Sequence, residues 1–174
     1  QYKIVLLGDM SVGKTCITQR FAQDIFTPFV EPTIISAFQS KQFQIDRDNS
    51  IRLDLWDTAG QEKYASLLPM YYREAKAAII VFDVSNPVTF QRALDWMKEM
   101  KDKCPIYLCA NKIDLHDRKV STQQAEELAN MNNMEYFEVS ALSGQGIKQM
   151  FEQIARKMTI RQPLASIERK QIIK

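Results

Sequence analysis

Short apolar runs alternate with amphipathic stretches along almost the whole chain. Four mainly apolar runs are expected to form strands buried within a sheet, and they cover residues 4–7, 77–84, 105–110 and 136–139. Residues 41–45 and 51–55 alternate polar and apolar side chains around a turn-rich link, which predicts a hairpin. Apolar residues at helical spacing predict helices that begin after Gly13, at Pro87, at Ser121 and at Ile147.

The order of these elements predicts the fold class. Because strands and helices alternate from end to end, we expect an α/β fold of three layers: a mainly parallel sheet with one antiparallel edge strand, flanked by helices. Ligands of such sheets bind beyond the carboxyl ends of the strands. The pattern weakens after Met158, so we expect one domain over residues 1–158 and a mobile C-terminal tail over residues 159–174.

Composition narrows the class of protein. A chain of 174 residues with 45% hydrophobic and 25% charged residues is typical of one soluble domain, which at this size needs no disulfide or metal to fold. The net charge of +2 gives no basic imbalance for binding nucleic acid, and the apolar runs are far shorter than the roughly 20 residues that span a bilayer. The three cysteines form no C-x-x-C pair, which indicates reduced thiols in the cytosol.

A glycine-rich motif lies between the first predicted strand and the first predicted helix. The chain has only five glycines, and Gly8 and Gly13 frame a match to G-x-x-x-x-G-K-[ST] at residues 8–15. The amides of such a loop and the start of the following helix bind phosphate oxygens, while the lysine reaches the β- and γ-phosphates and the hydroxyl coordinates Mg²⁺. The motif predicts a nucleoside triphosphate on a P-loop NTPase-type fold, with contacts from Asp9, Met10, Ser11, Val12, Gly13, Lys14, Thr15 and Cys16.

Two further motifs follow predicted strands. After residues 51–55, Asp57 is placed to hold the second shell of Mg²⁺, the Gly60 amide to approach a γ-phosphate and Gln61 to orient an attacking water. A plain helix cap at Asp57 and Thr58 is the alternative. After residues 105–110 comes Asn111-Lys112-Ile113-Asp114, whose last carboxylate can accept from N1–H and the 2-amino group of guanine, a donor pair that adenine lacks.

A backbone amide beside Ser140, Ala141 and Leu142, after the next strand, is expected to reach the same base.

Taken in order, these motifs and Thr33 resemble a small GTPase of the Ras superfamily from Lys3 to about Met158. Residues 56–64 and 71–73 resemble the Rab family in particular, and residues 68–73 with Ala37 and Phe38 resemble its early-endosomal subgroup.

The resemblance implies roles for residues that spacing alone does not assign. Thr33 is expected to bind Mg²⁺ and the γ-phosphate, Phe26 to lie against guanine and Lys112 to lie along it. Gln61, Lys14, Thr33 and Gly60 are the implied catalytic residues, and Thr15, Thr33 and Asp57 the implied metal site. Phe38, Trp56 and Tyr71 match an exposed trio that meets effectors, although burial statistics alone would place such large aromatics in the core.

The resemblance also implies a biological role. We expect a monomeric switch that hydrolyses GTP to GDP, recruits effectors in the GTP state and controls vesicle or endosomal traffic. Its expected partners are effectors, an exchange factor, a GTPase-activating protein and a GDP dissociation inhibitor, with no nucleic acid. Its expected location is the cytosol and the cytoplasmic face of endosomal or other vesicle membranes, reached through a C-terminal prenyl group. The sequence begins without methionine and its last residues hold no cysteine, so we expect the prenylated end to have been trimmed away.

Departures from the family pattern leave alternatives open. Met10 stands where the family has a small residue, beside the space that Gln61 and an incoming arginine need; it either slows hydrolysis or points harmlessly to solvent. A GTP-locked effector-binding module with little hydrolysis is therefore one rival function. A P-loop kinase or ATPase is another, which Asp114 disfavours. Ile35 replaces a usual glycine and Leu142 a usual lysine.

Overall fold

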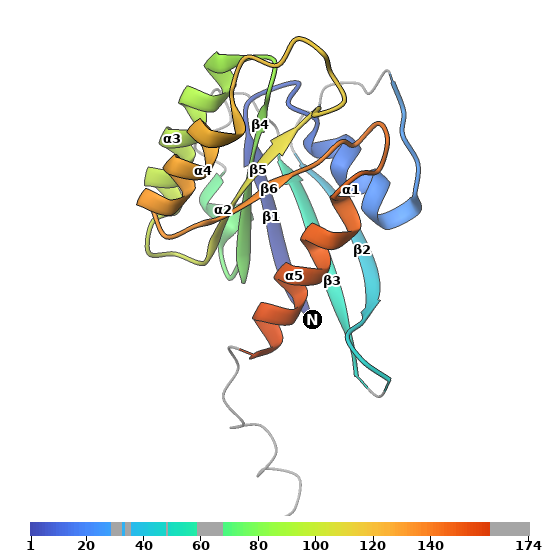
Figure 1. Cartoon of the computed structure of the whole chain (residues 1–174). Helices are drawn as coiled ribbons and strands as arrows, with labels where there is room; N and C mark the ends of the chain where they lie inside the picture. Colours follow the sequence, from blue (N-terminus) through green and yellow to red (C-terminus); the bar gives the residue numbers. More distant parts are fainter. Residues whose placement is uncertain (29–32, 34–35, 48, 59–67, 161–174) are drawn as a thin grey trace, which may run out of the picture.

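The computed structural model describes residues 1–28, 33, 36–47, 49–58 and 68–160. Strands and helices alternate through them (Figure 1). In chain order the elements are β1 (Tyr2–Gly8), α1 (Lys14–Gln23), β2 (Ser36–Gln44), β3 (Ser50–Thr58), α2 (Leu68–Tyr72), β4 (Ala77–Asp83), α3 (Pro87–Met100), β5 (Ile106–Asn111), α4 (Thr122–Met131), β6 (Glu135–Glu138) and α5 (Ile147–Ile160).

One sheet organises the domain. Its strand order is β2-β3-β1-β4-β5-β6, and only the edge strand β2 runs antiparallel, to β3. The predicted α/β class, with a mainly parallel sheet and one antiparallel edge strand, is therefore confirmed. The hairpin is longer than its alternating core indicated, because β3 continues to Thr58 and carries Asp57 within the strand.

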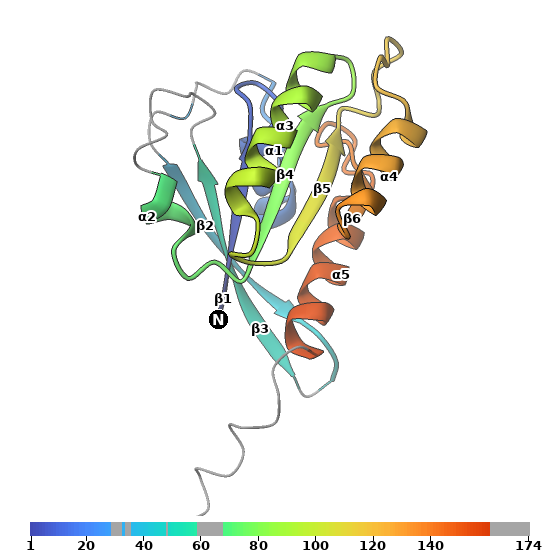
Figure 2. The same ribbon diagram turned by 90° about the vertical axis from the view of Figure 1, so that its left-hand side faces the viewer.

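Helices cover both faces of the sheet (Figure 2). Strand β1 shows the arrangement, since Ile4 and Leu6 pack toward α1 and α5 while Val5 and Leu7 pack toward α3 and α4. All four side chains are fully buried. Each contributes roughly 1.5–3 kcal/mol by leaving water, which explains why the strand is continuously apolar.

Local sequence signals fix where the helices begin. The Asn86 side chain accepts a hydrogen bond from the Val88 amide at the start of α3, and Ser121 and Gln124 form a reciprocal capping box on α4. Helix α5 extends to Ile160, and residues 161–174, which make up most of the predicted tail, lie outside the described residues. Within the described ranges, no helix combines the length and the apolar character needed to cross a membrane.

The parallel strands bring three chain segments to one edge. Strands β1, β4 and β5 end at Gly8, Asp83 and Asn111, and all three carboxyl ends point the same way. The loops that follow carry the glycine motif and the Asn111–Asp114 motif, so residues far apart in sequence meet above this edge.

Candidate nucleotide-binding site

Close contacts require both glycines of residues 8–15, the segment that we call the phosphate loop. Gly8 has φ +137°, and a Cβ there would lie 2.2 Å from the carbonyl oxygen of Val81 on β4. Gly13 has φ +97°, and a Cβ there would lie 2.4 Å from Nδ2 of Asn111. Both positions therefore exclude a side chain by conformation and by space, which explains the two glycines of the motif.

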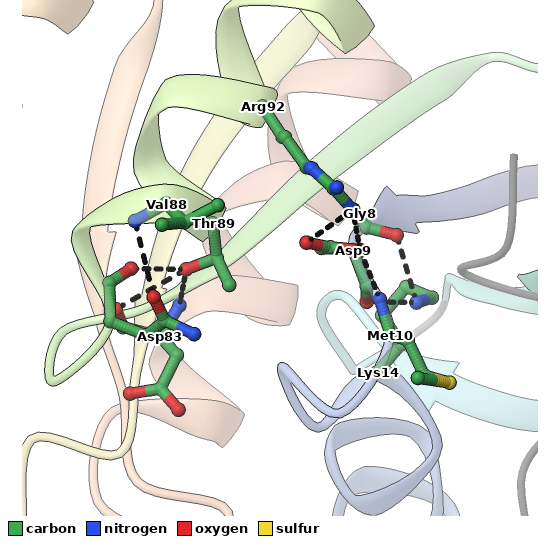
Figure 3. Close-up of polar contacts among 9 residues, drawn as sticks. Gly8, Asp9, Met10, Lys14, Asp83, Val88, Thr89 and Arg92 are labelled. Atoms are coloured by element: carbon green, nitrogen blue, oxygen red, sulfur yellow. Dashed lines mark hydrogen bonds and ion pairs between the residues drawn. The ribbon is translucent and has the colours of Figure 1, made fainter.

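Lys14 lies under the loop rather than in solvent. Its Nζ donates to the carbonyl oxygens of Gly8 at 3.0 Å and Asp9 at 2.8 Å (Figure 3). Burial lowers the Lys14 pKa to about 8, while the carboxylates of Asp57 and Asp9 act in the opposite direction. An added anion would favour the charged ammonium, so the loop holds a cation that a phosphate can stabilise.

A cavity of about 430 Å³ opens beside this loop. Thirteen residues that the sequence singles out for the nucleotide line it: Met10, Ser11, Gly13, Lys14, Thr15, Cys16, Phe26, Thr33, Asn111, Lys112, Asp114, Ala141 and Leu142. Pro28, Thr58 and Leu115 also line it. Thr58 belongs to the motif that begins at Asp57 but was given no nucleotide contact, while Pro28 and Leu115 had no motif to reveal them. Asp9, Val12 and Ser140 do not line it but hydrogen-bond to residues that do. Gly60 and Gln61 lie outside the described residues.

Three oxygens converge at one side of the cavity. The Thr15 hydroxyl donates to Oδ2 of Asp57 at 2.5 Å, the Thr33 hydroxyl reaches the same oxygen at 3.2 Å, and the two hydroxyls lie 3.1 Å apart. The other carboxylate oxygen of Asp57 is buried without a hydrogen-bond partner. Burial is the largest influence on the Asp57 pKa and raises it, although Thr15, Lys14 and Thr33 oppose the change. A buried carboxylate with hydroxyls beside it and an unused oxygen fits Mg²⁺, which takes oxygen ligands and is often completed by phosphate and water.

Asn111 joins the two ends of the cavity. Its amide nitrogen donates to the carbonyl oxygen of Val12 in the phosphate loop at 2.8 Å, and its amide oxygen accepts from the Ala141 amide at 3.1 Å. Its side chain is almost fully buried. The asparagine therefore holds the glycine loop against the loop after β6.

The far end of the cavity carries fixed charges. Asp114 accepts a hydrogen bond from the Ser140 hydroxyl, and Lys112 forms an ion pair with Asp83 at 2.6 Å. These partners orient the carboxylate of Asp114 and the stem of Lys112 at the cavity lining. The arrangement places an anionic acceptor opposite the cationic phosphate loop.

Comparison with known proteins identifies the family. The model of the Ras family matches residues 3–160. The chain belongs to the Ras family. The "GTP-binding protein ypt5" of Schizosaccharomyces pombe is 40% identical over 168 residues, 93% of this chain and 80% of its own length. "Ras-related protein RABF2a" of Arabidopsis thaliana is 43% identical over 166 residues, 92% of this chain and 82% of its own length. "Ras-related protein Rab-5A" of Dictyostelium discoideum is 40% identical over 163 residues, 91% of this chain and 81% of its own length.

Within the Ras family the chain is a Rab of the early-endosomal type. As such it is a GTPase, which hydrolyses GTP. The resemblance named from the motifs is thus confirmed, together with the fold.

The aromatic residues of this Rab do not all enter the core. Phe38 is 52% exposed and Trp56 is half-buried, and the two are paired across β2 and β3 with ring centroids 5.4 Å apart. Nζ of Lys3 lies 4.5 Å from the centre of the Trp56 ring. Burial statistics therefore fail for Phe38, as the family resemblance implied. The Tyr71 side chain and residue 35 lie outside what the structure describes.

Sequence reasoning missed an arginine that bonds to the loop carrying Ala141 and Leu142. Nε of Arg20 on α1 donates to the Ala141 carbonyl at 3.0 Å, and its Nη2 donates to the Leu142 carbonyl at 2.7 Å. The same guanidinium pairs with Asp24. No sequence signal predicts this contact, because it joins α1 to a loop more than a hundred residues later in the chain.

Proposed function

We propose that this Rab is a molecular switch that binds guanine nucleotide in the cavity described above. The observation that carries the proposal is that Lys14 of the glycine loop and Asp114 of the loop after β5 line a single cavity. A cationic loop suits the polyphosphate, and a carboxylate that accepts two hydrogen bonds suits the paired donors of guanine. Phe26, partly buried against the core, offers an apolar surface for the base.

Hydrolysis in this proposal rests on positioning and charge. The loop amides and the Lys14 ammonium bind the phosphate oxygens and stabilise the negative charge that spreads over them. Thr15, Thr33 and Asp57 would hold Mg²⁺, which when bound neutralises charge on the β- and γ-phosphates. Gln61 orients the attacking water and the Gly60 amide contacts the γ-phosphate, roles proposed from the motif alone.

Switching follows from the place of Thr33. Its hydroxyl contacts both Thr15 and Asp57, so the segment around residue 33 is linked to the metal site. In this proposal, loss of the γ-phosphate removes one contact of that segment. An order-to-disorder change then follows, of a kind that binding proteins recognise. Effectors would then distinguish the two states through the neighbouring surface of Phe38 and Trp56, with Tyr71 as the third member.

The proposed cellular role is control of vesicle and endosomal traffic. The relatives with Rab names support it, as does the exposed Phe38 beside the proposed switch. Regulators would be an exchange factor, a GTPase-activating protein and a GDP dissociation inhibitor, and a prenyl group would anchor the protein to the cytoplasmic face of the membrane. A fluorescent fusion of the protein that fails to label endosomal membranes in living cells would refute this role.

Nucleotide titration tests the proposed site. The nucleotide-free protein should bind GDP at least 100-fold more tightly than ADP, because adenine lacks the donor pair that the Asp114 carboxylate accepts. Mg²⁺ should tighten GDP binding further. Asp114→Ala should remove the preference for guanine. Asp117→Ala changes an exposed carboxylate three residues later and should retain it. Equal affinity of the parent for GDP and ADP, or binding of neither, refutes the proposal.

One observation favours the GTP-locked alternative. Met10 is 49% exposed and also lines the cavity, so its side chain lies at the opening rather than wholly in solvent. A thioether there would compete for space with a water, with Gln61 or with an arginine from an activating protein. The hydrolysis rate of a Met10 variant separates this function from an ordinary GTPase cycle.

A further inference from the structure

An arginine on α3 reaches across to the phosphate loop. Nη1 of Arg92 lies 2.9 Å from one carboxylate oxygen of Asp9 and 3.0 Å from the other (Figure 3). The Asp9 side chain is 13% exposed and the Arg92 side chain 48% exposed. The pair therefore joins a helix on the face of the sheet to the second residue of the glycine motif.

Asp9 also hydrogen-bonds to two other residues of the loop, Met10 and Lys14. Its Oδ1 also accepts a hydrogen bond from the Met10 amide at 2.8 Å, and its backbone carbonyl accepts from Nζ of Lys14. One residue thus fixes the direction of the Met10 backbone and supplies an anchor for the phosphate-binding lysine. Without Arg92, this partly buried carboxylate would keep the Met10 amide but lose its ion pair beside the proposed phosphate site.

The start of helix α3 is itself bonded to the end of β4. The amide of Asp83 donates to the hydroxyl of Thr89 at 3.0 Å, and the Asp83 carboxylate pairs with Lys112. Figure 3 shows Thr89 and Arg92 on neighbouring turns of the helix, the first facing Asp83 and the second facing Asp9. The helix therefore has a fixed start, which limits the freedom of Arg92 to follow a moving loop.

We propose that Arg92 is a positioning residue of the phosphate loop, which it holds through the carboxylate of Asp9, and that this contact slows the release of bound nucleotide. The inference rests on the proposed nucleotide site. It assigns Arg92 no contact with the nucleotide. Its effect on the ligand passes entirely through Asp9, Met10 and Lys14.

The test measures the release of a fluorescent GDP analogue from the Mg²⁺-loaded protein after addition of excess GDP. Arg92→Gln should release it about tenfold faster, as for the loss of a charge-assisted hydrogen-bonded pair. Arg92→Lys keeps the charge but replaces the planar guanidinium by an ammonium, and it should restore part of the difference. Because salt screens a half-exposed pair, the difference between Arg92→Gln and the parent should shrink at high ionic strength.

A double-mutant cycle decides whether Arg92 acts through Asp9. Asp9→Asn removes the charge but keeps an acceptor for the Met10 amide, so Arg92→Gln should change the release rate less than twofold in that background. Lys98→Gln is the matched control, because this lysine lies on the same helix and pairs with Asp95 on its own surface. It should release nucleotide at the parent rate.

Three results overturn the inference. These are a release rate for Arg92→Gln within twofold of the parent, an equal acceleration in the Asp9→Asn background, and an equal acceleration by Lys98→Gln. Failure of the proposed function has a different signature, because the parent itself would then show no bound analogue to release.

Discussion

Replacing Asn111 by alanine tests how far the nucleotide pocket depends on one buried amide. The substitution removes the hydrogen bonds to the Val12 carbonyl and from the Ala141 amide, at 2.8 and 3.1 Å. Both partners are buried. Alanine therefore leaves a donor and an acceptor unsatisfied on opposite sides of the cavity.

The expected loss of stability follows from the two backbone groups that are left without a hydrogen-bond partner. An unsatisfied buried backbone group costs about 1–3 kcal/mol, so two of them lower the free energy of unfolding by about 2–6 kcal/mol. Loss of the two hydrogen bonds also removes the link between the phosphate loop and the loop after β6 that carries Ala141. At 1.4 kcal/mol for each factor of ten, a loss of about 3 kcal/mol in preorganisation weakens GDP binding by about 100-fold.

Urea denaturation of the nucleotide-free protein and GDP titration measure the two effects. Asn132→Ala is the matched control, because its amide donates to Leu128 on the exposed end of α4 and should cost about 1 kcal/mol or less. Asn111→Asp keeps an acceptor for the Ala141 amide but turns an oxygen toward the Val12 carbonyl, so it should be no better than alanine. If Asn111→Ala matches the Asn132→Ala control in stability and binds GDP like the parent, the reasoning is wrong.

Three other substitutions or probes give sharp expectations. Met10→Ser should hydrolyse bound GTP faster than the parent in a single-turnover assay, because it clears the opening of the cavity; equal rates would reject a blocking role. The pKa of Glu138 is lowered because hydrogen bonds from Arg118, Tyr136 and Thr122 outweigh burial, which alone would raise it. Its ionised form thus stabilises the fold above pH 4.5, and this contribution is lost as the pH falls through the folded value. Glu138→Gln should therefore be about 1 kcal/mol less stable near neutral pH and should approach the parent in acid, as followed by urea denaturation. Burial raises the pKa of the Cys16 thiol, so a maleimide should label it slowly, and more slowly still with GDP bound, because Cys16 lines the cavity. Labelling of Cys104, outside the cavity lining, should not respond to GDP.

Much of the fold could be read from local pattern. The apolar run that became β4 predicts a strand within one residue of its observed end, because burial on both faces selects apolar side chains at all but its last residue. The motif at residues 8–15 predicts its own setting between a strand and a helix, which the structure has. Its glycines are demanded by the carbonyl of Val81 and the amide of Asn111.

Other features could not be read in advance. The exposure of Phe38 depends on which strands the helices cover. Within the described residues, α3 packs mainly on β1 and β4, and the short α2 contacts β3. No periodicity in residues 36–58 encodes the position of a helix that lies beyond residue 86.

The sequence by itself determined the alternation of elements, the phosphate motif and the membership of the Ras family, because each depends on residues that are neighbours in the chain. The tertiary structure alone decided that Asn111 bonds to Val12, that Arg20 holds the Ala141 loop and that Arg92 pairs with Asp9. These contacts join segments whose proximity is set by the order and register of parallel strands. Side-chain chemistry makes each of them favourable, but only the sheet brings the partners within reach.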